Sequence, residues 1–177
     1  MSVLKRQIEQ PAVIAFGANL GDRAATLHAA ATELAEADGV ELVAMSGLHE
    51  SIALKPGGAD PAAPEYLNAV ALVRTTLTPA ALLALLHSIE ELHGRERGEK
   101  WGDRTLDLDL VDFAGLTRPA GDGDGAALTL PHPRAHERDF VLRPWFEVDP
   151  DAVLPGAGRV AGLVAALDVA GHAEPGS

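Results

Sequence analysis

Trp-Gly-Asp-Arg-Thr-Leu-Asp-Leu-Asp-Leu, residues 101–110, passes from a polar and charged start into a strict alternation of leucine with aspartate. Successive side chains of a β-strand point to opposite faces, so the alternation predicts a strand that turns its leucines into the core. Asp107 and Asp109 then project together from the other face. The stretch therefore predicts a strand that carries two carboxylates on one side.

These two carboxylates form a candidate metal site. Carboxylates held so close repel each other unless a cation neutralises them, and Mg²⁺ typically takes one or two protein carboxylates together with substrate phosphates. An edge strand whose solvent face carries two acids would show the same pattern. Taken alone, Asp107 and Asp109 leave both interpretations open.

Cationic residues before the strand favour a site for an anion. Arg104 lies three residues before Asp107, and Arg95, Arg97 and Lys100 precede it. An arginine fork can hold the phosphate oxygens that a carboxylate-bound metal also contacts, which is the arrangement that phosphoryl transfer requires. A charged loop that is only solvated is the alternative. We predict a mobile, cationic loop next to the aspartate strand.

Two further segments have clear periodicity. The stretch from Tyr66 to Thr75 alternates, which predicts a strand with Tyr66 and Asn68 on one face. A threonine followed by Pro79 is a typical helix start, and apolar residues at helical spacing continue to a stop at Gly94. These two segments therefore predict a strand and a helix.

The remaining segments carry weaker patterns. They predict a strand at 13–16, a helix between 21 and 39, a loose strand at 40–48, a loop at 50–64, a flexible linker at 122–125, a short strand at 128–130 and a helix at 140–146. This order of elements favours an α+β sandwich over a doubly wound parallel sheet.

Composition narrows the class of protein. With 177 residues, 47% of them hydrophobic, the chain suits one domain over residues 1–177, with a core at about 12–167 and flexible ends at 1–10 and 170–177. A net charge of −12 disfavours nucleic acid and anionic membranes as partners. The lack of cysteine excludes disulfides and thiolate metal sites and fits a reducing cytoplasm. No apolar run is long enough to predict a membrane-spanning helix.

Residues 101–110 also closely resemble the signature of the 6-hydroxymethyl-7,8-dihydropterin pyrophosphokinase family, whose pattern is WGPRTLDLDI or similar. The resemblance covers about residues 12–167 in the right order. It includes Phe16-Gly17-Ala18-Asn19-Leu20-Gly21-Asp22-Arg23, Tyr66-Leu67-Asn68, Leu128-Thr129-Leu130-Pro131-His132-Pro133, Arg138 and Phe140. The chain departs from the pattern at Asp103, where proline is usual, at residues 50–55, which replace a polar-proline pair, and in a slightly shorter charged loop.

The resemblance implies a ferredoxin-like α+β sandwich, a mainly antiparallel sheet flanked by helices, with mobile active-site loops. It also implies transfer of diphosphate from ATP to 6-hydroxymethyl-7,8-dihydropterin, with release of AMP, in folate biosynthesis. Asp107 and Asp109 match the ligands of two Mg²⁺ ions that lie between the substrates. The matching catalytic positions are Arg95, Arg97, Arg104, Asp107 and Asp109.

The resemblance further assigns residues to each substrate. Positions that match the ATP site are Glu90, Arg95, Arg97, Arg104, Thr129, His132 and Arg138. Positions that match the pterin site are Leu54, Tyr66, Asn68, Trp101, Asp107 and Phe140. In the family the aromatic rings stack on the pterin, the amide bonds its edge and the tryptophan belongs to a lid. Taken singly, Glu90 also fits a solvated helix face, Phe140 an ordinary core position and His132 a loop surface.

Two other functions were weighed against this one. A metal-dependent phosphohydrolase would use the same two aspartates with an activated water, but would need no aromatic slot. A catalytically silent binding module on the same fold would be expected to lose an aspartate or Arg104, and this chain keeps them. We therefore predict an ATP- and Mg²⁺-dependent pyrophosphokinase that acts on small molecules as a cytoplasmic monomer, without nucleic acid or membrane partners.

Overall fold

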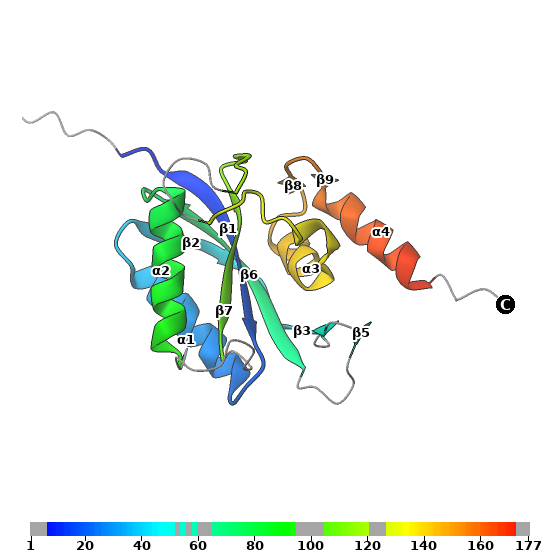
Figure 1. The fold of residues 1–177 in the computed structure, drawn as a ribbon, viewed down its shortest axis with the longest axis horizontal. Coiled ribbons are helices and arrows are strands. Elements are labelled where there is room, and N and C mark those ends of the chain that lie inside the picture. The colour runs from blue at the N-terminus through cyan, green and yellow to red at the C-terminus, as the bar shows by residue number, and fades with distance from the viewer. Residues whose placement is uncertain are drawn as a thin grey trace, which may run out of the picture.

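The computed structural model describes residues 7–51, 65–94, 105–120 and 127–171, with the backbone alone at 54–55, 58–59 and 172. In chain order the elements are β1 (Gln10–Ala18), α1 (Arg23–Glu36), β2 (Val40–Met45), β3 (His49–Ser51), β4 (Leu54–Lys55), β5 (Gly58–Ala59), β6 (Tyr66–Thr75), α2 (Pro79–Leu92), β7 (Asp107–Phe113), η1 (Ala135–Glu137), α3 (Asp139–Val148), β8 (Val153–Leu154), β9 (Gly158–Arg159) and α4 (Val160–His172). Figure 1 shows the main sheet with α1 and α2 on one side and α3 and α4 on the other.

An antiparallel sheet forms the centre of the described fold. Its strand order is β2-β6-β1-β7, and β3 pairs with β6 on the same side as β2. The predicted strand from Tyr66 to Thr75 is confirmed as β6, and the aspartate strand is confirmed as β7. The α+β architecture with a mainly antiparallel sheet is therefore as predicted.

The sheet is covered on both faces, so each face has its own core. Alternate residues of β6 point to opposite cores, with Ala69 packed beside α1 and α2 and Val70 packed beside α3. On the first face α1 and α2 contribute Leu27, Ala30, Ala31, Leu34, Leu82, Leu86 and Ile89. The predicted alternation of β6 is thus explained by burial on both of its faces.

Helix α2 starts and stops as its sequence predicts. The hydroxyl of Thr78 accepts a hydrogen bond from the backbone N–H of Ala81 at 3.2 Å, and Pro79 opens the helix. Gly94, with a φ of 90°, follows its last turn in the left-handed conformation that glycine adopts readily. This helix packs along β7 and ends close to the segment that leads into the aspartate strand.

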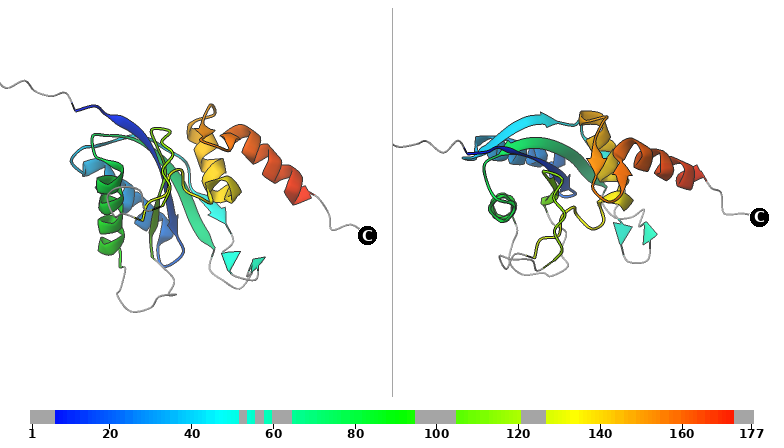
Figure 2. Two further views of the ribbon diagram at one scale, coloured as in Figure 1. Left: turned by 45° about the horizontal axis from the view of Figure 1, so that its top comes forward. Right: turned by 90° about the horizontal axis from the view of Figure 1, so that it is seen from above.

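Helix α3 covers the second face of the sheet. Val141, Leu142 and Trp145 pack against Val13, Val70 and other residues of β1 and β6. Helix α4 packs on α3 and then runs away from the sheet, as Figures 1 and 2 show. Among the described residues, no helix combines the length and the apolar character needed to cross a membrane.

Several weaker predictions need correction. Within the predicted loop at 50–64, β3 continues to Ser51, and residues 54–55 pair with residues 58–59 as β4 and β5. The predicted strand at 128–130 is reduced to one bridge between Leu130 and Arg118. At the ends, β1 begins at Gln10 and α4 continues to His172. The predicted linker at 122–125 lies outside the described residues.

The pairing of β1 with β7 contains one irregularity. Ile14 pairs with Leu110 but Val13 pairs with Asp112, so Val111 is an extra residue on β7. Such a bulge bends the strand and reverses the side to which the following residues point. Between Asp107 and Leu110 the alternation is regular, so the bulge lies beyond the two aspartates of interest.

Candidate active site

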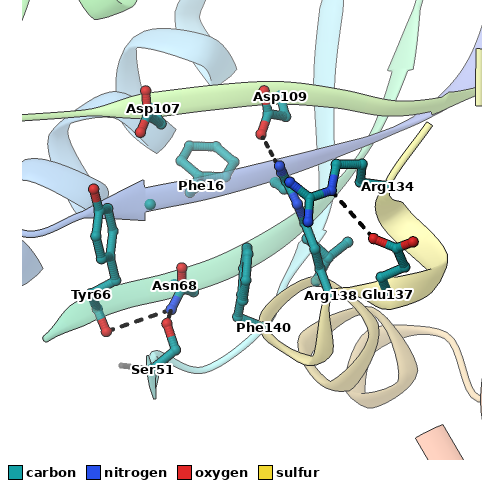
Figure 3. Close-up of a pocket in the computed structure, with 13 residues that line it drawn as sticks. Phe16, Ser51, Tyr66, Asn68, Asp107, Asp109, Arg134, Glu137, Arg138 and Phe140 are labelled. Carbon is teal, nitrogen blue, oxygen red and sulfur yellow. Dashed lines mark hydrogen bonds and ion pairs between the residues drawn. The ribbon is translucent and has the colours of Figure 1, made fainter. Parts of the chain in front are cut away.

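A cavity of about 240 Å³ opens on the α3 side of the sheet, over the ends of β7, β1 and β6. Figure 3 shows its side chains arriving from the sheet on one side and from η1 and α3 on the other. Its lining includes Gly17, Ser51, Tyr66, Asn68, Asp107, Asp109, Arg134, Glu137, Arg138 and Phe140. Six of the predicted site residues therefore meet in one place, namely Tyr66, Asn68, Asp107, Asp109, Arg138 and Phe140.

The floor of the cavity is a row of paired residues across neighbouring strands. Gly17 pairs with Asp107 on one side and with Asn68 on the other, and Asn68 pairs with His49. A Cβ atom at Gly17 would lie 3.5 Å from Oδ1 of Asn68 and 3.8 Å from Cδ1 of Tyr66. Gly17 therefore leaves open the space between the carboxylate and the amide. It lies inside β1 rather than at the strand end predicted for it.

Asp107 and Asp109 occupy the same face of β7, as the alternation predicts. Leu106, Leu108 and Leu110 are buried on the opposite face, and the side chain of Asp109 is 43% exposed. Residues two apart in a strand are about 6.6–6.8 Å apart along it, so both carboxylates border one small volume. Two accessible hard oxygen ligands suit Mg²⁺, which leaves its other positions to water and phosphate oxygens. Within the described part of the chain, no group of three or more His, Asp or Glu side chains gathers into a fuller metal cage.

Asn68 is buried and fixed by strand β3. Its Nδ2 donates to the hydroxyl of Ser51 at 2.7 Å and to the backbone carbonyl of His49 at 3.2 Å. The amide oxygen is thereby directed toward the floor at Gly17. In Figure 3 the rings of Tyr66 and Phe140 lie on either side of this amide. The arrangement is a slot for a flat polar ring, with aromatic side chains at its walls.

Arg138 joins the aspartates to the aromatic wall. Its Nη1 donates to Oδ2 of Asp109 at 3.5 Å, and its guanidinium carbon lies 5.6 Å from the centre of the Phe140 ring. The first contact is a long ion pair, and the second is within the range of a cation–π interaction. The cation therefore stands beside the carboxylate end of the cavity, where an anionic group could also reach it.

His132 lies beside the cavity but is not part of its lining. Burial lowers the pKa of His132, and the nearby Arg138 and Arg134 lower it further, while Asp109 acts in the opposite direction. Its Nδ1 accepts a hydrogen bond from the backbone N–H of Arg134 at 3.3 Å. A neutral ring that accepts at Nδ1 carries its proton on Nε2. His132 can therefore offer an N–H donor without adding a positive charge.

Glu90 and Thr129 also lie outside the cavity lining. Glu90 is 6% exposed, and its Oε1 accepts a hydrogen bond from the backbone N–H of Leu108 at 2.8 Å. The solvated helix face that we considered for Glu90 is wrong, because the side chain is buried against β7. Thr129 is half-buried in the segment that precedes His132.

Arg95, Arg97, Trp101 and Arg104 lie outside the described residues, as does the side chain of Leu54. Their assignments to ATP, pterin and catalysis remain predictions.

Seven lining residues were not among the predicted site residues, namely Ala15, Phe16, Gly17, Ser51, Arg134, Glu137 and Val141. Ser51 was hidden in a presumed loop, and Gly17 was interpreted only as turn chemistry. Arg134 and Glu137 form an ion pair at 3.3 Å on the rim. Their spacing of three residues matches one helical turn, and this is the signal that would have placed them together.

The model of the family "7,8-dihydro-6-hydroxymethylpterin-pyrophosphokinase (HPPK)" matches residues 13–150. Three curated relatives carry the name 2-amino-4-hydroxy-6-hydroxymethyldihydropteridine pyrophosphokinase. The one from Synechocystis is 40% identical over 84% of this chain and 71% of its own length. The one from Haemophilus influenzae is 38% identical over 86% of this chain and 90% of its own length. The one from Mycobacterium leprae is 40% identical over 83% of this chain and 76% of its own length.

Solved structures share the fold. A Plasmodium falciparum HPPK-DHPS chain in complex with STZ-DHP superposes with a TM-score of 0.70 at 13% identity, and covers 94% of this chain. A second HPPK-DHPS structure, in complex with substrates, gives a TM-score of 0.70 at 12% identity over 92% of this chain. This chain spans 47% and 44% of the length of those two chains. The likeness confirms the predicted ferredoxin-like α+β fold.

Proposed function

Because this chain belongs to the 7,8-dihydro-6-hydroxymethylpterin-pyrophosphokinase family, we propose that it transfers diphosphate from ATP to 6-hydroxymethyl-7,8-dihydropterin, a step of folate biosynthesis. One observation supports the assignment most directly. The carboxylates of Asp107 and Asp109 border the same cavity as the slot between Tyr66 and Phe140. A phosphate-binding metal seat next to a flat-ring slot is the juxtaposition that this reaction requires.

The pterin occupies the slot between the aromatic rings. Stacking on Tyr66 and Phe140 orients the flat ring, and the amide of Asn68 bonds its polar edge. The cavity of about 240 Å³ is below the roughly 300–1,000 Å³ of most ligand sites, which suits one small bicyclic ring. The triphosphate of ATP therefore extends beyond the cavity, along β7 and the segment that carries His132 and Arg138. We retain Leu54 and Trp101 as further pterin contacts.

Asp107 and Asp109 would hold Mg²⁺, and we propose two ions, as the match to the family pattern implies. Bound Mg²⁺ supplies positive charge that neutralises phosphate oxygens and lowers the pKa of a coordinated hydroxyl. The protein contributes two fixed, half-exposed carboxylates on a rigid strand. Rigid placement matters because such catalysis depends mainly on positioning and electrostatics.

The cations near β7 bind the triphosphate. Arg138 is placed beside Asp109, and neutral His132 offers its Nε2–H as a donor. Arg95, Arg97 and Arg104 are proposed to bind the triphosphate, as their match to the family pattern implies. Glu90 and Thr129 are retained as residues of the nucleotide side, with Glu90 acting through the strand that it contacts.

The transfer requires no reactant besides ATP and the pterin. The hydroxymethyl oxygen of the pterin bonds to the β-phosphorus, and the bond from that phosphorus to the oxygen of the α-phosphate breaks. AMP leaves, the proton of the hydroxyl passes to water, and the pterin carries the diphosphate. The cavity's aromatic walls exclude water that would hydrolyse ATP instead.

We further propose that the chain acts as a cytoplasmic monomer of one domain. The acidic net charge and the absence of cysteine support this proposal. Light scattering coupled to gel filtration measures the mass directly, and a dimer at micromolar concentration would contradict the monomer.

The decisive experiment is product analysis. Purified protein is incubated with ATP, Mg²⁺ and 6-hydroxymethyl-7,8-dihydropterin, and nucleotides and pterins are separated by chromatography. We expect AMP and the pterin diphosphate in equal amounts, and neither product when the pterin is left out. Formation of ADP, or of phosphate without pterin diphosphate, would favour the phosphohydrolase instead.

A further inference from the structure

Strand β3 forms one wall of the cavity, yet it is short. Among the described residues it runs for three residues, His49 to Ser51, and pairs with the start of β6. A strand of this length makes few ladder hydrogen bonds, so its position depends on contacts from elsewhere in the fold. Its placement matters because Ser51 and the carbonyl of His49 hold the amide of Asn68.

The outside support for β3 comes from the last turn of α3. One carboxylate oxygen of Glu147 accepts a hydrogen bond from the backbone N–H of Gly47 at 2.8 Å. The other oxygen lies 2.5 Å from Nε2 of His49. Glu147 thus binds both the segment that leads into β3 and the first side chain of that strand.

The local chemistry is built for this contact. The bonds from Gly47 and His49 lower the pKa of Glu147, so its carboxylate is charged at neutral pH. A Cβ atom at position 47 would lie 3.3 Å from Oε1 of Glu147, which is tighter than most such contacts. The lack of a side chain at Gly47 therefore lets the carboxylate reach the backbone.

The same helix carries the opposite wall of the cavity. Phe140 and Glu147 lie seven residues apart in α3, which is about two helical turns, so they share one side of the helix. Phe140 lines the cavity, and Glu147 holds the strand that fixes Asn68. One rigid helix therefore connects the aromatic wall to the amide wall.

We propose that His49 and Glu147 are positioning residues that set the distance between Phe140 and the Asn68 amide, and so determine affinity for the pterin. The inference rests on the proposed function. Neither residue lines the cavity, so they act through β3 and α3. Loss of the pair lets β3 move relative to α3, and the slot then fits the ring less well.

The test compares binding of the two substrates. Glu147→Ala and His49→Ala are each expected to weaken pterin binding about tenfold, measured by fluorescence titration with a nonhydrolysable ATP analogue present. KM for ATP should change less than about twofold. The double variant should be no weaker than either single variant, because the two residues act as one unit. Glu147→Gln should recover part of the affinity, since its amide oxygen still accepts from Gly47.

A matched control is available on the same helix. Arg143 pairs with Asp168 of α4 at 2.5 Å, away from β3. Arg143→Ala removes this ion pair and a longer one with Asp139 at 3.9 Å, and should leave pterin affinity unchanged. Affinity unchanged in Glu147→Ala, equal losses for pterin and ATP, or additive losses in the double variant would each overturn the positioning role. Failure of the wild type to bind pterin at all would instead overturn the proposed function, and with it this inference.

Discussion

The carboxylate of Glu90 accepts a hydrogen bond from the backbone N–H of Leu108, on the peptide bond that joins Leu108 to Asp107. This N–H points away from β1, toward α2. Strand β7 lies at the edge of the described sheet, so no strand is present on that side to accept the hydrogen bond. Helix α2 supplies the acceptor instead. Glu90 thereby fixes the orientation of the backbone that presents the two aspartates.

Two substitutions of Glu90 distinguish the contribution of its hydrogen bond from the contribution of its negative charge. Glu90→Ala leaves a buried N–H without an acceptor and should lower the free energy of unfolding by about 1–3 kcal/mol. Glu90→Gln keeps an oxygen acceptor and should lose less stability and less kcat. Urea denaturation and steady-state kinetics measure both effects. If the glutamine variant were as inactive as the alanine variant, the negative charge rather than the hydrogen bond would be what matters.

The two aspartates should be essential for turnover but not for folding. Asp107→Ala and Asp109→Ala are each expected to lower kcat by roughly 100-fold or more, because each removes a ligand of the proposed Mg²⁺. Circular dichroism should show an intact fold, since both side chains face the cavity rather than the core. Retained activity in either variant would reassign the metal seat.

Asp112 provides the control for those variants. It lies on the same strand, outside the cavity lining, and its carboxylate accepts from the backbone N–H of Gly115 at 3.2 Å. Burial raises the pKa of Asp112. Asp112→Asn should therefore keep nearly full activity. A large loss of activity would show that turnover depends on the total negative charge of β7 rather than on Asp107 and Asp109 in particular.

Gly17→Ala should obstruct the pterin without unfolding the chain. The added methyl group would touch Asn68 and Tyr66 at ordinary van der Waals distances, so the fold can accept it. The methyl group would nevertheless occupy the floor of the slot, and we expect KM for the pterin to rise roughly tenfold or more. Gly162→Ala, in α4 with nothing within 4 Å, serves as the control and should leave KM unchanged. Equal KM values for wild type and Gly17→Ala would contradict the proposed floor.

The stabilising effect of Glu147 should depend on pH with a definite sign. Its pKa in the folded protein lies below the ordinary value of 4.5, chiefly because the carboxylate accepts the Gly47 N–H. Between the two values the unfolded chain binds more protons, so stability rises with pH. The wild type should exceed Glu147→Gln in stability above about pH 4.5 and lose that advantage as the pH falls through the lowered pKa. Thermal melts of both proteins across the acidic range test this, and a constant difference would contradict it.

Local sequence patterns predicted those segments in which the side chains alternate regularly between two environments. Strand β6 is buried on both faces and β7 alternates core with cavity, so each leaves a repeat that can be recognised in the sequence. Strand β3 is too short to show a repeat, and its position depends on Glu147, about a hundred residues later. Helix α4 was missed because Val160–His172 is apolar almost throughout and so lacks the polar face that marks a surface helix.

The sequence brought several cavity-lining residues to attention, but not the contacts that support them. Tyr66, Asn68, Asp107, Asp109 and Phe140 follow from strand faces and the family pattern. The buried position of Glu90 could not follow from helical spacing, because it arises where α2 meets the edge of β7. Ser51 likewise becomes part of the cavity only through its pairing with β6.

The fixed amide of Asn68 has a consequence for the choice of ligand. Its N–H groups bond to Ser51 and His49, so toward the cavity it presents an oxygen. A ring that offers an N–H at that edge can donate to the amide oxygen of Asn68. A ring that offers only a lone pair there would place its own nitrogen or oxygen against that amide oxygen, and the two would repel each other. Among inhibitors built on other bicyclic rings of similar size and stacking, those with a hydrogen-bond donor at that edge would therefore bind, and those with only an acceptor there would not.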